Sequence, residues 1–468
     1  MTPFLAVLLA AGRGTRMNSS RPKVLHQVLG EPMLEGVLRA VEQAGARSIV
    51  TIVGHEAEAV RAAFSGRCQF VLQDPPRGTG DAVRAARTLL QEHRDVPTLV
   101  LNGDLPLLQA STIAGLLDTQ IERRAAATLL TARLEDPGRY GRVLRDDAGR
   151  VRAIVEAKDA APQELAQHEI NAGAYVFDTQ RLLPALDALQ PKNAQGEYYL
   201  TDVVAGFVSR GLPVEALTAG DASEALGVNT LEELAAINGL LRRRRLQELM
   251  AAGVVVEDPE STWVGRAVQV AADAVLRPST LLEGKTSVQS GAVLGPFVRI
   301  VDSQIGAGAQ VLDHCLLREA QVGAGAVIGP FAQLRPGSEV GERAKVGNFV
   351  ELKNTRLGEG SKAPHLSYLG DSEIGKGVNV GAGTITCNYD GVDKHPTRIE
   401  AGSFIGSNAT LVAPISIGAG AYIAAGSTIT EDVASDALAL GRARQVGKPG
   451  WARARREQRA AAKTKAKA

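Results

Sequence analysis

An aliphatic residue recurs every six positions through the carboxyl-terminal half of this 468-residue chain, and this spacing constrains the fold more than any other feature. The repeat has three runs: Val264, Val270, Leu276, Leu282, Val288, Leu294 and Ile300; Val322, Ile328, Leu334, Val340, Val346 and Leu352; and Ile399, Ile405, Leu411, Ile417, Ile423 and Ile429. A six-residue period fits neither an α-helix nor a β-hairpin, but it is typical of a parallel β-helix with hexapeptide sides. We therefore predict that residues 251–440 wind into a prism with the aliphatic side chains pointing inward.

The six-residue period is interrupted twice, at residues 358–373 and 387–398. The first interruption contains His365, with Tyr368 three residues later. A solitary histidine is more often structural than catalytic. A coil of hexapeptides can also serve only to assemble subunits, so the function of this half depends on what the interruptions carry.

The amino-terminal end starts with an apolar run, residues 4–9, followed by Gly12-Arg13-Gly14-Thr15-Arg16-Met17 and then by Lys23. Such a turn after a first parallel strand usually cradles phosphate, because glycine lets backbone N–H groups approach the oxygens. Met17 stands where a dinucleotide motif would have its third glycine, and no P-loop Gly-Lys-Ser/Thr follows directly. Since Arg16 and Lys23 add fixed positive charge, we predict nucleotide chemistry rather than a turn that binds nothing.

Strands and helices alternate through the rest of the amino-terminal half. The expected strands are residues 48–54, 70–73 and 98–102, and the expected helices are residues 32–44, 56–64, 80–91 and 231–250. This alternation predicts a Rossmann-like α/β domain built on a parallel sheet, with its ligand crevice at the carboxyl ends of the strands. Residues 231–250 show helical spacing of apolar residues and are expected to form one long connecting helix.

Polar residues close two of the expected strands. Gln73 ends one strand and is followed by Gly78-Thr79-Gly80, so a side-chain amide and open backbone could match the acceptors and donor of a uracil edge. Asn102-Gly103-Asp104 ends the next strand. A carboxylate beside a phosphate loop suits Mg²⁺, which often takes one or two carboxylates plus substrate phosphates. The alternative for Asp104 is a simple Asx turn.

The composition excludes several classes of partner. A net charge of +1 leaves no basic field for nucleic acid, and four consecutive arginines, 242–245, are expected to form a solvated face or an interdomain contact. Cys68, Cys315 and Cys387 are too widely spaced for a metal-ligand pattern and favour a reducing compartment. Because no apolar run is long enough for a membrane span, we expect a cytoplasmic protein without a membrane partner.

The motifs of both halves, taken in order, resemble the bacterial bifunctional N-acetylglucosamine-1-phosphate uridylyltransferase and glucosamine-1-phosphate acetyltransferase family. The amino-terminal motifs are LAAGRGTRM, Pro22-Lys23, Gln73, Gly78-Thr79-Gly80, Gly103-Asp104, Tyr140-Gly141, Glu156, Asn171 and Gly227-Val228-Asn229. The carboxyl-terminal motifs are LRPG, ELKN, HLSYLGD and NVGAGTITCNYDG. Asp81 is a departure, because the family usually has histidine there, and it leaves open how strictly UTP is preferred.

The resemblance implies two reactions that together make UDP-N-acetylglucosamine for bacterial cell-wall and lipopolysaccharide synthesis. Glucosamine 1-phosphate takes an acetyl group from acetyl-CoA, and N-acetylglucosamine 1-phosphate then takes a uridylyl group from UTP. Residues 1–228 would form the uridylyltransferase, residues 229–250 a linker helix and residues 251–468 the acetyltransferase. The second domain would be a left-handed parallel β-helix of the kind that forms trimers, so a homotrimer is expected.

The resemblance also assigns roles to individual residues. The residues implied for nucleotide and sugar binding in the first domain are Leu9, Ala10, Ala11, Gly12, Lys23, Gln73, Gly78, Thr79, Asn102, Gly103, Asp104, Gly141, Glu156, Asn171 and Asn229. Those implied for the sugar phosphate in the second domain are Arg335, Lys353, Tyr368 and Asn379, and those for acetyl-CoA are Ala382, Asn388, Tyr389, Ser407, Ala425 and Arg442. Asp104 and Asn229 would hold Mg²⁺.

The expected chemistry follows from these roles. In the first domain Arg16, Lys23 and Mg²⁺ would neutralise charge while a sugar-phosphate oxygen attacks the α-phosphorus of UTP. In the second domain His365 would be the general base, with Glu351 orienting or charge-tuning its imidazole. Two alternatives stay open: a nucleotidyltransferase whose β-helix only assembles subunits, and an inactive regulatory relative. The tail, residues 451–468, has no apolar stripe and is expected to be mobile, touching CoA phosphates or nothing.

Overall fold

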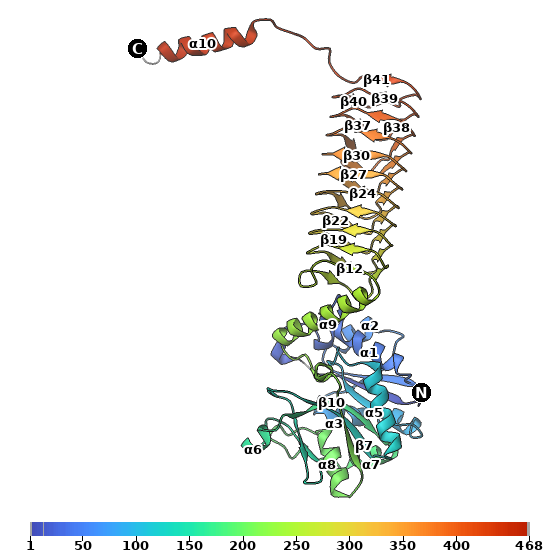
Figure 1. Ribbon diagram of the computed structural model, residues 1–468, viewed down its shortest axis with the longest axis vertical. Helices are drawn as coiled ribbons and strands as arrows, with labels where there is room; N and C mark the ends of the chain where they lie inside the picture. The colour runs from blue at the N-terminus through green and yellow to red at the C-terminus, as the bar shows by residue number, and fades with distance from the viewer. Residues whose placement is uncertain (1, 13, 466–468) are drawn as a thin grey trace. The chain divides into compact units, whose positions relative to one another are not determined.

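The computed structural model describes residues 2–12 and 14–465, so Arg13 of the glycine-rich loop lies outside the described residues. The chain divides into two compact units. The amino-terminal unit comprises the residues up to Glu248 with Val264–Arg266, and the carboxyl-terminal unit comprises Leu249–Trp263 and the residues from Ala267 onward. The first unit is an α/β domain and the second is a β-helix, as Figure 1 shows.

The sheet of the amino-terminal unit has the strand order β11-β7-β10-β6-β1-β4-β5. Its strands are β1 (Leu5–Ala10), β4 (Ser48–Val53), β5 (Gln69–Leu72), β6 (Thr98–Asn102), β7 (Ala127–Arg133), β10 (Glu169–Phe177) and β11 (Val214–Thr218). Strands β1, β4, β5 and β6 are parallel, as predicted, but β10 runs antiparallel to both β6 and β7. A parallel neighbour needs a crossover connection. Between β7 and β10 the chain instead forms the hairpin of β8 (Arg142–Arg145) and β9 (Val151–Val155), so β10 enters the predicted parallel sheet as an antiparallel strand.

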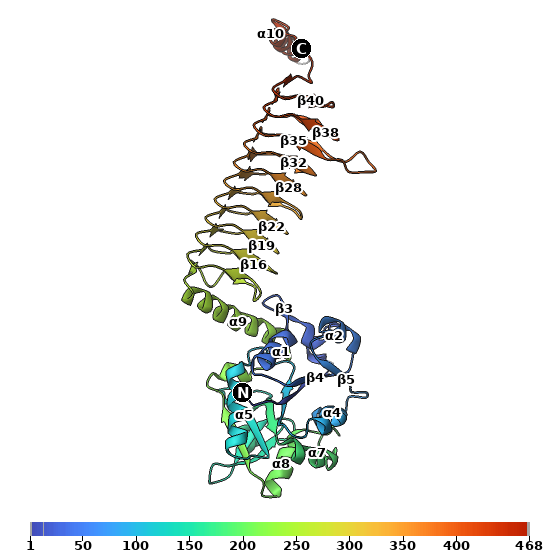
Figure 2. The same cartoon turned by 90° about the vertical axis from the view of Figure 1, so that its right-hand side faces the viewer.

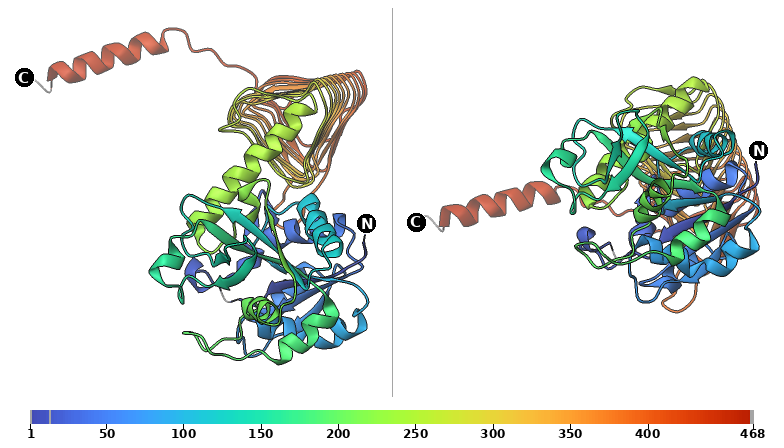
Figure 3. Two further views of the ribbon diagram at one scale, coloured as in Figure 1. Left: turned by 60° about the horizontal axis from the view of Figure 1, so that its bottom comes forward. Right: turned by 90° about the horizontal axis from the view of Figure 1, so that it is seen from below.

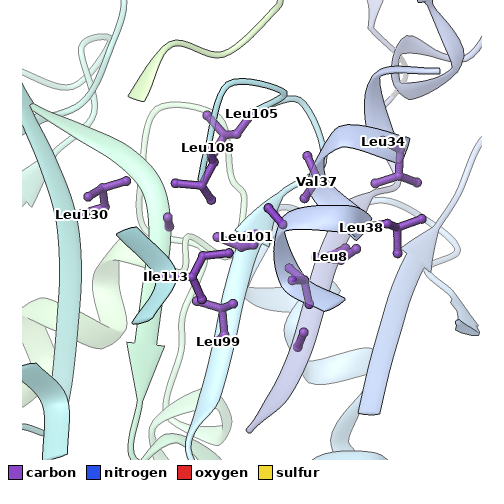
Figure 4. Packing of buried hydrophobic residues seen from close by; sticks show 14 of the residues in the cluster. Leu8, Leu34, Val37, Leu38, Leu99, Leu101, Leu105, Leu108, Ile113 and Leu130 are labelled. Carbon is purple, nitrogen blue, oxygen red and sulfur yellow. The ribbon is translucent and has the colours of Figure 1, made fainter. Parts of the chain in front are cut away.

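Helices cover both faces of this sheet. Alternate residues of β1 enter the two cores: Ala6 and Leu8 pack on one face, Leu5 and Val7 on the other. Helices α1 (Met33–Gln43) and α5 (Ala110–Glu122) cover the first face, whose packing Figure 4 shows. Helices α3 (Thr79–Ala85), α4 (Arg87–Glu92), α7 (Thr179–Asp187) and α8 (Thr201–Ser209) cover the second face. Residues 80–91 therefore form two helices, not the single one expected, because the backbone leaves helical geometry at Ala86.

The predicted long helix is α9 (Leu231–Ala251). Its residues Ile237 and Leu241 are buried against Met17 and Met33 of the amino-terminal unit. Within the arginine block, Arg244 donates to the Leu107 carbonyl oxygen at 3.1 Å and to the Asp221 carboxylate at 2.6 Å. The helix is thus packed and hydrogen-bonded onto the first unit over most of its length.

The carboxyl-terminal unit is a left-handed parallel β-helix, and this prediction is confirmed. Three sheets of 11, 10 and 9 strands run along it, from β12 (Val255–Val256) to β41 (Leu438–Ala439), and the view in Figure 3, left, shows the turns stacked in register. Each strand pairs with the strand one turn later, as Leu276 does with Leu294. The hexapeptide aliphatic residues are almost all buried in its interior.

The first predicted interruption of the coil does not exist. Residues 358–373 continue the three sides as β30 (Lys362–His365), β31 (Tyr368–Gly370) and β32 (Ser372–Ile374), with Ala363 and Leu369 fully buried at the inward positions. The aliphatic pattern missed this turn because alanine fills one inward position. In addition, the side from Leu369 to Ile374 is one residue short.

The second interruption is a true excursion, residues 388–396, between β34 (Ile385–Cys387) and β35 (Thr397–Ile399). It projects from the coil in Figure 2. At its base the Asn388 side chain, which is buried, donates to the Asp371 carboxylate. This contact ties the start of the excursion to the preceding turn.

The tail forms helix α10 (Trp451–Lys465), which the sequence analysis did not predict, and residues 466–468 lie outside the described residues. Among the helices of the described chain, none is long and apolar enough to cross a membrane.

Candidate active sites

Two neighbouring clefts lie in the amino-terminal unit, and the predicted residues divide between them. The first cleft, of about 420 Å³, is lined by residues that follow β1, β5 and β6. Its predicted members are Leu9, Ala10, Ala11, Gly12, Lys23, Gln73, Gly78, Thr79, Asn102 and Asp104. Gly78 has a φ of +107°, and a Cβ there would lie 2.5 Å from the Tyr198 carbonyl oxygen, so only glycine fits this wall.

The second cleft, of about 230 Å³, holds the predicted residues Gly141, Glu156, Asn171 and Asn229. It shares Leu9, Thr79, Asn102 and Asp104 with the first cleft, so the two spaces meet at these residues. Gly103 lines neither cleft; its N–H donates to the Leu9 carbonyl oxygen at 2.9 Å and joins the loop after β6 to the end of β1. Sequence reasoning missed Glu197 in the first cleft and Arg139 in the second.

Opposite charges converge where the clefts meet. The Lys23 ammonium donates to the Asp104 carboxylate and, at 2.7 Å, to the side-chain oxygen of Asn229. That same oxygen accepts from the Arg16 guanidinium at 2.8 Å. Asn229 is fixed because its backbone N–H donates to Glu233 in the first turn of α9 at 2.5 Å. The side chains of Arg16, Lys23, Asp104 and Asn229, which are far apart in the sequence, thus form one hydrogen-bonded cluster.

The Asp104 and Asn229 oxygens fit a magnesium ion that relies on substrate for its other ligands. Both oxygens are bonded by the same Lys23 ammonium, so they face a common point. Among residues 2–12 and 14–465, no group of three or more histidine, cysteine, aspartate or glutamate side chains could hold a metal. An ion here would depend on phosphate oxygens and water, which is how Mg²⁺ is usually held.

The second cleft has an acidic wall. Partial burial raises the pKa of Glu156, and the nearby carboxylates of Asp159 and Asp202 raise it further. Asn171 donates from its side-chain amide to the Tyr175 hydroxyl at 2.6 Å. A carboxyl group with a raised pKa and an anchored amide can exchange hydrogen bonds with a neutral polyol such as a sugar.

The candidate site on the β-helix lies on its outer surface. Arg335 donates to Glu351 at 2.8 Å, and Glu351 lies in register with Tyr368 one turn later. These residues and Lys353 belong to one sheet, whereas His365 and Asn379 belong to the neighbouring sheet. Two sides of the coil therefore contribute to the site.

The imidazole of His365 is held by a residue that the sequence analysis missed. The ring Nδ1–H donates to the side-chain oxygen of Asn348, 2.6 Å away, which leaves Nε2 able to accept a proton. Glu351 accepts a hydrogen bond from Arg335, so the ring is held by Asn348, and the expected role of Glu351 in orienting or charge-tuning the imidazole stays a prediction. The corner at Phe349 puts Asn348 on the sheet of His365 and Glu351 on the next one.

A second missed residue is Lys394 of the excursion. The adjacent Lys353 lowers the pKa of Lys394 through a side-chain contact and charge repulsion. Asp371 lies 4.0 Å from the Lys353 ammonium and also accepts from Asn354 at 2.8 Å. Two neighbouring ammonium groups favour an anion. The sequence signal was weak, because Lys394 lies 41 positions after Lys353.

The residues implied for acetyl-CoA fall into separate groups. Ala382, Ser407 and Ala425 stack at one corner of three successive turns, where Asn408 N–H donates to Ala382 and Gly426 N–H donates to Ser407. Asn388 is buried at the base of the excursion, while Tyr389 is exposed and donates to the Gly391 carbonyl oxygen. Arg442 follows β41 and is exposed.

Comparison with known proteins gives matches in both units. Residues 6–204 match the model of the MobA-like NTP transferase domain. Residues 319–354 match the bacterial transferase hexapeptide (six repeats), and residues 396–431 match the hexapeptide repeat of succinyl-transferase.

Whole-length relatives carry the name bifunctional protein GlmU. The protein of Heliobacterium modesticaldum is 49% identical over 439 residues, which cover 94% of this chain and 95% of the relative. The Carboxydothermus hydrogenoformans protein is 46% identical, covering 95% of this chain and 99% of the relative. The Geobacillus protein is also 46% identical, over 96% and 98% of the two chains.

Proposed function

Because this chain belongs to the bifunctional GlmU family, we propose that the residues described above carry two successive transfers, one in each unit. The chain is a bifunctional transferase that acetylates glucosamine 1-phosphate from acetyl-CoA and then makes UDP-N-acetylglucosamine from UTP, releasing pyrophosphate. We assign uridylyl transfer to residues 1–228 together with Asn229, and acetyl transfer to residues 251–468. The observation that carries the uridylyl assignment is the pair of clefts that meet at Asp104.

In uridylyl transfer, UTP would occupy the first cleft and the sugar the second. An oxygen of the sugar 1-phosphate forms a bond to the α-phosphorus of UTP, and pyrophosphate leaves with the electrons of the broken bond. Lys23 and Arg16 would align the phosphates and neutralise the charge that develops between the clefts. Mg²⁺, held by Asp104 and Asn229, would supply further neutralisation. Glu156 and Asn171 would hold the sugar hydroxyls.

In acetyl transfer, the amine of glucosamine 1-phosphate attacks the thioester carbonyl carbon, and CoA leaves as its thiol. His365 would remove the amine proton through Nε2, while Asn348 fixes the ring through Nδ1. Lys353, Lys394 and Arg335 would bind the phosphate. The stacked corner of Ala382, Ser407 and Ala425, together with Asn388, Tyr389 and Arg442, would bind acetyl-CoA.

A homotrimer would complete the acetyl site. Beside His365 begins a corner column of Phe297, His314, Phe331, Phe349 and Leu366. The rings of its first four residues stack at centroid distances of 4.8 to 5.3 Å. All five residues are exposed, and each has a positive φ, a costly backbone state for side chains of this size. A continuous apolar edge of this kind suits burial against a second copy.

The three cysteines are free thiols, which suits the cytoplasmic location that we propose.

Two assays on the purified full-length chain test the proposal. With acetyl-CoA and glucosamine 1-phosphate, we expect release of CoA thiol that depends on the amino sugar. With UTP, N-acetylglucosamine 1-phosphate and Mg²⁺, we expect pyrophosphate. Pyrophosphate without thiol release would favour the alternative in which the β-helix only assembles subunits.

A further inference from the structure

We propose that Asp81 sets the base preference of the first cleft by fixing the side-chain amide of Gln73 so that its oxygen faces the base. The inference rests on the proposed uridylyl transfer. Asp81 would act on the base indirectly, through its hydrogen bond to Gln73. Asp81 is therefore a positioning residue for nucleotide selection.

The contacts of Gln73 define its orientation. Its side-chain nitrogen donates to the Gly78 carbonyl oxygen and to the Asp81 carboxylate, both at 3.0 Å. Gln73 is only 5% exposed, and what remains faces the first cleft. Both hydrogens of the amide are thus used by the protein, which leaves its oxygen for a ligand.

Only one orientation of this amide satisfies its neighbours. A backbone carbonyl and an ionised carboxylate accept hydrogen bonds and cannot donate them. If the Gln73 amide turned over, its oxygen would face two other oxygens in a buried setting, which is costly. Asp81 therefore adds a second acceptor that holds the Gln73 amide in the orientation already favoured by the Gly78 carbonyl.

Asp81 is kept in its ionised, acceptor-only form. Burial acts to raise its pKa, but hydrogen bonds from Gln73 and Arg84 and the charge of Arg77 outweigh burial and lower the pKa overall. Arg84 lies 2.6 Å from the carboxylate, and its guanidinium stacks 4.5 Å above the Tyr198 ring. The Arg84 guanidinium that binds Asp81 is thus itself held in place by the Tyr198 ring.

An amide oxygen facing the cleft selects bases by their hydrogen-bond pattern. Uracil carries an N3–H donor that such an oxygen can accept. Cytosine has a lone pair at N3, which would repel it. A site that pairs with a substrate N–H discriminates strongly against an analogue that lacks it. We therefore expect UTP to be preferred to CTP, with Asp81 responsible for part of that preference.

The test compares Asp81→Ala with wild type in the full-length protein, using kcat/KM for UTP and for CTP with N-acetylglucosamine 1-phosphate. We expect the UTP-to-CTP ratio to fall about tenfold, the size of one strong hydrogen bond. The acetyltransferase rate of the same sample serves as a check on the protein. Asp187→Ala, which removes an exposed ion-paired aspartate of the same unit, should leave the ratio unchanged.

The outcomes separate the two claims. If wild type releases pyrophosphate from UTP but Asp81→Ala slows UTP and CTP equally, Asp81 is only structural and the inference is overturned. If wild type makes no pyrophosphate, the proposed function fails and the inference with it. Should Asp81→Ala not fold, Asp81→Leu fills a similar space but offers the Gln73 amide no acceptor. An unchanged ratio in that variant would also overturn the inference.

Discussion

The two candidate sites differ in how the chain encloses them. Where the clefts of the amino-terminal unit meet, the side chains of Lys23 and Asp104 are 15% and 14% exposed. On the β-helix, Arg335 and Glu351 are 42% and 35% exposed. The first site is walled by loops of one sheet, whereas the second is an outer surface of repeated turns. A site of the first kind can be complete in one chain, while one of the second kind gains from a neighbouring copy that excludes water.

This contrast predicts that the two activities can be lost separately. One of the two largest effects is expected for Asp104→Ala, which removes the carboxylate that both clefts share. Pyrophosphate release should fall by roughly a thousandfold, because the proposed Mg²⁺ site would lose its carboxylate ligand and the phosphate charge would be less neutralised. CoA thiol release should stay within about twofold of wild type. Asp187→Ala is the matched control, and loss of both activities in a folded Asp104→Ala protein would contradict the two-site assignment.

The converse effect is expected for His365→Ala. Acetyl transfer should fall by about a hundredfold to ten-thousandfold, the usual contribution of a general base, and pyrophosphate release should be unchanged. His168→Ala removes an exposed histidine that is hydrogen-bonded to the Leu134 carbonyl oxygen, and it should affect neither reaction. Acetyl transfer that survives His365→Ala would assign the proton transfer to another group.

The role of a second copy is tested by Phe331→Glu in the corner column. A buried carboxylate without a partner disfavours association, so light scattering should show smaller particles than wild type. Acetyl transfer should fall on the order of tenfold, while uridylyl transfer is retained. Leu165→Glu places the same charge at an exposed leucine of the first unit and should change neither mass nor activity. A smaller Phe331→Glu particle with full acetyl transfer would show that one chain suffices for this site.

The fold was largely predictable because the inward positions of a β-helix obey a local rule. A buried Ile, Leu or Val recurs every six residues on most sides of the coil and every five on some, regardless of its distant neighbours. The rule failed at Ala363, because alanine was not counted as an inward aliphatic residue and the regular turn there was not recognised. Strand direction was not predictable at β10, since a buried strand has the same apolar pattern in either direction.

The sites were predictable where polar residues follow strands of the sheet. Asp104 was chosen for that reason and Lys23 as a fixed charge of the glycine-rich loop, and the structure brings the two into contact. Asn348 and Lys394 were missed because their partners are 17 and 41 positions away, across a corner and along an excursion. Local sequence does not encode such contacts, so Glu351, which lies in a recognisable motif, was assigned to the imidazole while Asn348 was missed.

The smallest expected effect concerns the paired ammonium groups of the exposed site. The neighbouring Lys353 lowers the pKa of Lys394, so Lys394 loses its charge at a lower pH than an ordinary lysine. Phosphate binding should therefore weaken early on the alkaline side, as a rise in KM for glucosamine 1-phosphate. In Lys394→Arg the guanidinium stays charged. The KM rise should then begin at higher pH, with a difference of about twofold to threefold, typical of exposed ion pairs.

The measurement is KM for glucosamine 1-phosphate against pH for wild type and Lys394→Arg, with the uridylyl reaction of each sample as the control. The enclosed site contains neither residue, so its alkaline profile should be identical in the two proteins. Lys376→Arg, at an exposed lysine bonded to Glu359, is the matched substitution on the coil. If Lys394→Arg and wild type show the same alkaline profile, Lys394 does not bind the phosphate. The open site would then rely on Lys353 and Arg335, both of which lie on the coil itself.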